Sequence, residues 1–206
     1  MRNKVFLTLT FLLSTILYAQ TWDFNSSTNT PSDLTVGNGS VVANGNGNLS
    51  NGYFNFGSNY LDFRGNGTRY VQFPAVNTSG GSSTLAFDLI NGNSNNGGEL
   101  NDSGEEVVLK YSTDGGSNWT THTTYARSDY QKSAPVAVSV NLTGSLSASS
   151  IIFRLEQLTH SGSSFDHWGL DDLVLNTVDN TAPTITSTAV AADNSTISVT
   201  FSEAVY

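Results

Sequence analysis

Short runs in which apolar residues alternate with other residues restrict the fold of this chain more than any other feature. Residues 85–89, 107–111, 136–140 and 151–153 all alternate with a period of two. Successive side chains of a β-strand point to opposite faces, so this pattern is typical of half-buried strands. No long stretch repeats at the helical period. The pattern therefore predicts an all-β, antiparallel jelly-roll β-sandwich over residues 20–178.

The composition agrees with many short strands joined by polar loops. Glycine occurs 19 times, aromatic residues make up 11% of the chain, and charged residues only 12%. Gly and Asn favour turns, whereas aromatic and β-branched residues favour strands. Residues 44–52 and 91–104 are Asn/Gly-rich and are expected to be loops. The second is long for a hairpin connection, and long loops often carry a functional site.

Charge and cysteine content exclude several function classes. Eight Lys and Arg residues stand against seventeen Asp and Glu, which gives a net charge of −9. A chain this acidic cannot present a basic patch, so we expect no nucleic-acid partner. Acidic side chains are compatible with a divalent cation. The chain has no cysteine, which excludes disulfides, thiolate zinc sites and cysteine nucleophiles.

The first 19 residues have the parts of a secretory signal peptide. Arg2 and Lys4 provide the positive start, Val5 to Leu17 are mostly apolar, and Ala19 puts a small residue before the expected cleavage point. The apolar run is too short for a membrane anchor, which needs about 20 residues. We therefore expect a secreted or cell-surface protein that is not inserted in a membrane once the signal is removed.

The C-terminal end predicts a second module. Residues 179–183 form a polar linker that ends in a proline, and residues 184–190 and 195–201 are rich in β-formers. The stretch from Thr181 resembles the opening of a bacterial Ig-like repeat. Two strands cannot bury a core of their own. Residues 184–206 are therefore expected to be the truncated start of an Ig-like domain, in a chain that is part of a longer protein.

Several motifs of the central region occur in the order found in one known family. The chain has LDFRG at residues 61–65, LAFDL at 85–89, EEVVLKYSTDGGSNW at 105–119 and FRLEQLTHSGSSFDHWGLDDLVL at 153–175. This series resembles the jelly-roll subrepeat of reelin over residues 21–176. The resemblance implies a jelly-roll fold and a calcium site, but it does not imply a ligand.

Residues 112–119 match an Asp box, S-x-D-x-G-x-x-W, a motif also known from sialidase propellers. Asp114 can accept hydrogen bonds from turn N–H groups, and the two glycines that follow allow positive φ. A propeller needs several repeated blades, and the motif occurs once. We therefore interpret it as a structural hairpin.

Two adjacent carboxylates, Asp171 and Asp172, begin an otherwise apolar strand. Simple alternation places Asp171 on the face of Leu173 and Leu175, where a carboxylate is costly unless it is bonded or binds a cation. The reelin resemblance implies that Asp171 is a calcium ligand. Calcium takes six to eight oxygen ligands, and the further candidates are Asp23 and Asp88, with Glu105 and Glu106 as weaker ones. The alternative is that these acids bond turns and solvent.

A polar cluster precedes this strand. His160, Asp166 and His167 suggest a zinc site, or a Ser/His/Asp catalytic set with Ser161 or Ser164. The favoured interpretation is that His160 and Asp166 bond loop backbone, so no catalytic residue is assigned. Two cations in expected strands, Arg69 and Arg154, are interpreted as partners of the acidic excess.

Three aromatic residues, Trp119, Tyr125 and Tyr130, are candidates for a platform on which a sugar ring stacks. The alternative is that these rings fill the edge of the sandwich.

These observations predict an exported, non-catalytic recognition or adhesion module that is stabilised by calcium and binds a glycan or a surface protein. One alternative is an accessory, carbohydrate-binding-type module of a secreted hydrolase whose catalytic domain lies beyond Tyr206. Another is a spacer without a ligand.

Overall fold

The computed structural model describes residues 16–25, 29–43, 54–92, 99–163, 165–179, 183–193 and 195–202. Several predicted features lie wholly or partly outside these residues. They are most of the signal peptide, the loop at 44–52, part of the loop at 91–104, Ser164 and the middle of the linker. The strand β1 (Ile16–Trp22) covers the expected cleavage point after Ala19.

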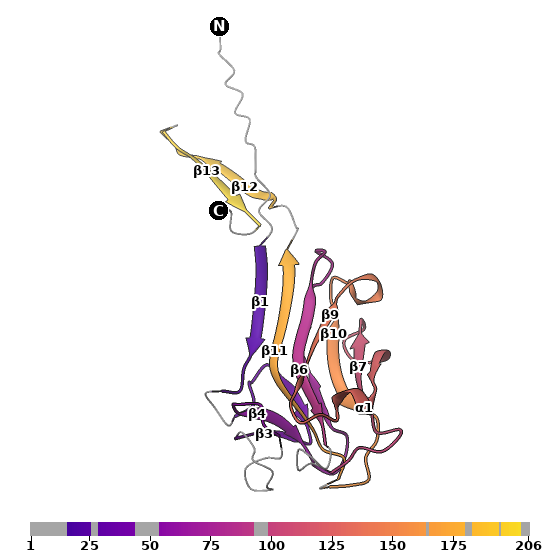
Figure 1. Ribbon diagram of the computed structural model, residues 1–206. Coiled ribbons are helices and arrows are strands. Elements are labelled where there is room, and N and C mark those ends of the chain that lie inside the picture. The colour runs from indigo at the N-terminus through magenta and orange to yellow at the C-terminus, as the bar shows by residue number, and fades with distance from the viewer. Residues whose placement is uncertain are drawn as a thin grey trace.

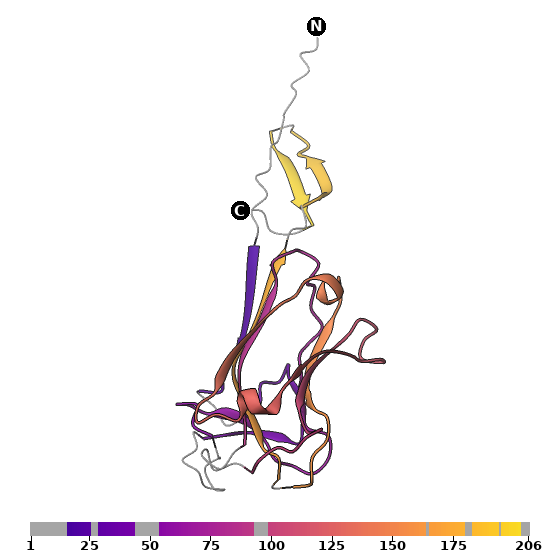
Figure 2. The same ribbon diagram turned by 45° about the vertical axis from the view of Figure 1, so that its right-hand side comes forward.

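Two antiparallel sheets face each other (Figures 1 and 2). We call the six-stranded one sheet A; its strands are β1, β3 (Gly39–Val42), β4 (Tyr60–Phe63), β6 (Thr84–Asn91), β9 (Val136–Asn141) and β11 (Trp168–Asp179). We call the five-stranded one sheet B; its strands, in order, are β2 (Thr35–Gly37), β5 (Tyr70–Gln72), β10 (Ile152–Gln157), β7 (Val107–Ser112) and β8 (Thr120–Tyr125). The only helices described are α1 (Arg127–Tyr130) and a short 3-10 helix (Gly144–Leu146).

The core lies between the two sheets and is built from the alternating residues. From β6 it receives Leu85, Phe87 and Leu89, while sheet B contributes residues such as Leu109 and Phe153. Each large apolar side chain buried in this way contributes roughly 1.5–3 kcal/mol to stability. At one end of the core the rings of Phe63 and Trp168 stack with their centroids 3.9 Å apart. The predicted all-β jelly-roll sandwich is confirmed.

The longest strand, β11, organises sheet A. Its residues Trp168 to Leu170 pair with β4, and Leu173 to Asp179 pair with β1. Along its other edge it pairs with β6, with a register shift between Asp171 and Val174. At this irregularity Asp172 has a φ of +50°. Between the pairs Asp171–Asp88 and Val174–Ala86, β11 has one residue more than β6. This is a β-bulge, which changes the face to which the next side chains point.

The tail forms a hairpin of β12 (Ile185–Val190) and β13 (Ile197–Phe201). The two strands pair with each other and form a separate two-stranded sheet. The hairpin lies beyond the end of the sandwich at which β11 ends (Figure 1). Every residue of β12 is exposed. The predicted pair of strands is therefore present, and its assignment to an Ig-like domain stays a prediction.

Candidate functional site

Asp171 lies on the outer face of sheet A, not on the core face predicted by simple alternation. Leu170 and Leu173 both belong to the core, although they are three positions apart along the strand and simple alternation would place them on opposite faces. The bulge at Asp171–Val174 makes this possible, and it turns Asp171 away from Leu173 and Leu175. The predicted face was wrong because a bulge adds one residue to a period-two pattern.

On this outer face Asp171 and Asp88 are directly opposite each other on β11 and β6. Burial raises the pKa of Asp171, and the charges of Asp172 and Asp88 raise it further. The pKa of Asp88 is also raised, by burial and by Asp172. Three carboxylates thus repel one another at this place, which is the electrostatic condition that a bound cation would relieve.

An aromatic layer covers the neighbouring part of sheet A and supplies a partner for Asp171. Phe54, Phe56 and Tyr60 lie on Gly169, where a Cβ atom would be only 2.8–3.1 Å from their rings. The same segment brings the Ser58 hydroxyl to Asp171, to which it donates a hydrogen bond of 2.8 Å. Asp171 also accepts a bond of 2.9 Å from the Asp172 N–H. Each carboxylate oxygen has two lone pairs, so a further ligand can still be accepted.

The other predicted cation ligands are not gathered here. Asp23 is exposed and follows directly after β1. Glu105 lies in a different cluster, around Asp166, and Glu106 precedes β7. In the part of the chain that the structure describes, no three His, Asp or Glu side chains are grouped closely enough to hold a metal ion.

The Asp box forms the tight connection between β7 and β8, as a structural hairpin requires. Asp114 accepts bonds from the Asn118 N–H at 2.9 Å and from the Ser112 hydroxyl at 2.7 Å. Hydrogen bonds from Asn118 and Ser112 lower the pKa of Asp114 to about 2. Gly115 and Gly116 have φ values of +74° and +90°, a region that glycine enters without a steric penalty.

His160 and Ser161 are bonded to groups other than each other. His160 Nε2 lies 2.7 Å from the Gly67 carbonyl oxygen, and Nδ1 accepts a bond of 3.1 Å from the Gly162 N–H. Because Nδ1 accepts a hydrogen bond, the ring proton is on Nε2, which donates it to the Gly67 carbonyl. Both ring nitrogens are therefore bonded to backbone groups. The Ser161 hydroxyl donates to Glu105 at 3.0 Å. These bonds agree with the favoured loop-bonding interpretation of His160.

The buried Arg69 holds this loop in place. Arg69 has no solvent exposure and donates five hydrogen bonds. They go to the carbonyl oxygens of Gly65, Gly162, Phe165 and Asp166 and to the Gln157 side chain, at 2.7–3.0 Å. Sequence reasoning treated Arg69 only as a partner for acids, because four of the five groups that it binds lie about 90 residues away.

Three carboxyl groups meet beside this arginine. Burial alone would raise the pKa of Asp166, but bonds from Glu105, from the Ser161 N–H and from Glu99 hold it below its usual value. The pKa values of Glu99 and Glu105 are raised, by burial first and by Asp166 next. The hydrogen bond that the Asp166 carboxylate accepts from the Ser161 N–H is 2.5 Å long.

The three predicted platform aromatics do not lie on one surface. Tyr125 is only 5% exposed and belongs to the core. Its ring meets those of Phe87 and Tyr130 edge to face, at centroid distances of 5.7 and 5.5 Å. Trp119 instead lies on the outside of sheet B, against Arg154. The platform as predicted is therefore not formed, because the inward register of β8 buries Tyr125.

On the outer face of sheet B the structure assembles a different aromatic group. The Arg154 guanidinium carbon lies 4.0 Å from the centroid of the Trp119 ring and 4.4 Å from that of Tyr70. Tyr70 comes from β5 and Arg154 from β10, whereas Trp119 directly precedes β8. Tyr70 was missed because the spacing of three distant segments does not indicate that they meet.

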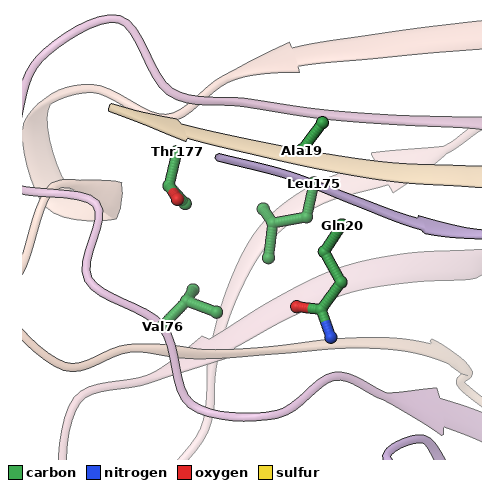
Figure 3. Close-up of a pocket in the computed structure, with 5 residues that line it drawn as sticks. All are labelled: Ala19, Gln20, Val76, Leu175 and Thr177. Atoms are coloured by element: carbon green, nitrogen blue, oxygen red, sulfur yellow. The ribbon is translucent and has the colours of Figure 1, made fainter. Parts of the chain in front are cut away.

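A cavity of about 260 Å³ lies at another place, between β1, β11 and the chain that follows β5. It is lined by Ala19, Gln20, Val76, Leu175 and Thr177. Figure 3 shows Leu175 and Gln20 extending from neighbouring strands towards Val76. The lining has no charged side chain, and it contains no residue of the predicted sites.

Among the described residues, no helix has the length and apolar character needed to cross a membrane.

A β-sandwich of two antiparallel sheets, with polar sites on its outer faces, defines the class as a jelly-roll domain. The family profile of reelin subrepeat B matches residues 46–176, more than half of the chain. The chain therefore belongs to the reelin subrepeat B family, and the predicted resemblance is confirmed.

The solved structures to which this chain is similar share little sequence with it. One is the K3 cleaved adhesin domain of Lys-gingipain from Porphyromonas gingivalis, with a TM-score of 0.53 and 14% identity over 80% of this chain and 99% of that one. The K1 cleaved adhesin domain of the same protein gives 0.47 and 12%, over 78% and 98%. A family 35 carbohydrate-binding module from Clostridium thermocellum gives 0.38 and 11%, over 77% and 97%. The comparison with curated proteins gives no match.

Proposed function

We propose that this domain is an exported, non-catalytic recognition module that binds a glycan or a surface protein and is stabilised by calcium. The observation that carries the proposal is the outer face of sheet B, where Trp119, Tyr70 and Arg154 form a partly exposed aromatic and cationic group. Aromatic and arginine side chains are enriched where proteins bind partners. The adhesin domain of Lys-gingipain, which has the same fold, supports the same class of function.

A binding screen combined with a hydrolysis screen tests this function. Residues 20–178 should bind members of a glycan array or an intact cell surface, while polysaccharide, sialoside and ester substrates stay at background turnover. We expect no turnover because His160 and Ser161 are bonded to other groups and not to each other, so they do not form a base and nucleophile pair. Turnover that His160→Ala abolishes would overturn the non-catalytic assignment. An absence of binding to every glycan and surface would overturn the recognition function.

The calcium part of the proposal is supported by the chemistry of the Asp171 and Asp88 pair. The two carboxylates are adjacent; Asp171 is buried and Asp88 is partly buried. Burial and like charges raise the pKa values of both. Calcium accepts carboxylate, backbone carbonyl and water oxygens, so two carboxylates can anchor it while the remaining ligands come from backbone and solvent. When bound, the ion would relieve the repulsion between the carboxylates of Asp171, Asp88 and Asp172.

A melting experiment tests the cation. A ligand that binds only the folded state adds about 2.7 kcal/mol to the free energy of unfolding at a hundredfold excess over its Kd. We expect the melting temperature in calcium to exceed that in EDTA by several degrees, and Asp171→Asn to remove the difference. Asp129→Asn, in α1, changes an exposed carboxylate elsewhere and should leave it unchanged. A melting temperature that is equal in calcium and EDTA would contradict calcium stabilisation.

A further inference from the structure

One row of polar side chains crosses the whole outer face of sheet B. The registers pair Thr35 with Gln72, Gln72 with Arg154, Arg154 with Lys110, and Lys110 with Thr121. Directly paired residues of neighbouring strands point to the same face. With strands about 4.8 Å apart, the row across five strands is roughly 19 Å long. A row of this length can contact several sugar rings.

Two cations of this row share one carboxylate. Lys110 and Arg154 are direct cross-strand neighbours, an arrangement that repels unless it is compensated. Glu156 accepts from Lys110 Nζ at 2.6 Å and from Arg154 Nη1 at 3.3 Å. Two positive charges against one negative charge leave an excess of one positive charge, on a protein whose net charge is −9.

Both cations retain hydrogen-bond donors. Arg154 gives one bond from Nη1 to Glu156 and one each from Nε and Nη2 to Gln72, at 3.3 and 2.6 Å. A guanidinium has five N–H groups and an ammonium has three. Lys110 donates to Glu156. The side chains of Arg154 and Lys110 are each 19% exposed, so an oxygen atom of a ligand can reach them.

We propose that this face binds a sugar chain through an isolated carboxylated sugar, a hexuronate. The proposal rests on the proposed function and names its site and ligand class. The sugar ring stacks through its C–H face on the side of the Trp119 ring that Arg154 does not cover. Its carboxylate extends past the edge of the ring and accepts hydrogen bonds from Arg154 and Lys110. A single excess positive charge matches one carboxylate. A densely charged polyanion would instead be repelled by the seventeen acidic residues of the chain.

A matched pair of ligands tests this proposal. Cellobiouronic acid and cellobiose differ only in a carboxylate against a hydroxymethyl group. Titration calorimetry on residues 20–178 should give cellobiouronic acid at least a tenfold lower Kd, which corresponds to about 1.4 kcal/mol. The difference should shrink as salt is raised, because salt screens partly exposed charges.

Variants locate the site. Lys110→Met keeps the aliphatic stem and removes the excess charge, so it should abolish the preference for the acid while cellobiose binding remains. Trp119→Ala should lose both ligands. The controls are Lys132→Met, which removes an exposed lysine elsewhere, and Phe165→Ala, which removes an aromatic ring that is 49% exposed on another loop. Both controls should bind as the original chain does.

Other outcomes separate this inference from the proposed function. Equal binding of the two ligands, lost in Trp119→Ala, would overturn the acidic ligand class and leave glycan recognition intact. A preference for the acid that Lys110→Met and Trp119→Ala do not change would overturn the site. If neither ligand binds, the inference is wrong, and the glycan array decides the proposed function separately.

Discussion

Replacement of Arg69 by leucine should destabilise the domain more than replacement of any other cation in the sandwich. The side chain is fully buried and donates to four carbonyl oxygens and to Gln157. The Asp166 carbonyl keeps a second donor, because Gln157 Nε2 lies 2.9 Å from it. The carbonyls of Gly65, Gly162 and Phe165 therefore lose the bond that arginine provides.

The magnitude follows from these lost bonds. A carbonyl left without its donor costs about 1–3 kcal/mol, and the lower end applies to these partly buried groups. Three such carbonyls cost about 3 kcal/mol. The attraction of Arg69 to Asp166, Asp62 and Glu105 is lost as well, so the total should be about 3–5 kcal/mol. For a chain of this size the melting temperature should fall by roughly 10 °C.

Urea denaturation of residues 20–178 at neutral pH measures this change. Arg127→Leu is the matched control, since Arg127 donates a single bond of 2.8 Å to the Asn101 carbonyl and should cost only about 1 kcal/mol. Equal losses of stability in the two variants would refute the role of Arg69 as the clamp of the loop. Limited proteolysis should also cut the Arg69→Leu variant first between residues 158 and 167.

Two further predictions concern pH and the tail. Burial raises the pKa of Asp62 from 3.8 to about 6, so the folded state holds the proton more tightly than the unfolded state. Asp62 should therefore make the free energy of unfolding fall as pH rises from about 4 to about 6. Asp62→Asn should remove this pH dependence and add up to about 3 kcal/mol to the free energy of unfolding at pH 7. An unchanged pH dependence in the variant would contradict the role of Asp62. Truncation after Val178 should leave the melting temperature within about a degree, because β12 and β13 pair only with each other in the described structure. A drop of several degrees would make the hairpin part of the first domain.

Local patterns were sufficient for the fold class and for individual hairpins. The period-two runs at residues 85–89 and 107–111 predict strands whose apolar side chains enter one core, and β6 and β7 have this arrangement. The Asp box predicts its own turn because Ser112, Asp114 and Asn118 bond within seven residues. Such features depend on neighbours in the chain, so a single sequence contains the information needed to predict them.

The sites depend on contacts between distant segments, and these were decided only by the tertiary structure. The bulge after Asp171 reverses its face, because register shifts are set by packing and not by the alternation of residue types. Tyr125 is buried whereas Trp119 meets Arg154 and Tyr70 on the outside of sheet B. By itself the sequence determined which residues form strands and turns. The pairing of strands far apart in the chain determined which side chains share a face, and therefore where a ligand can bind.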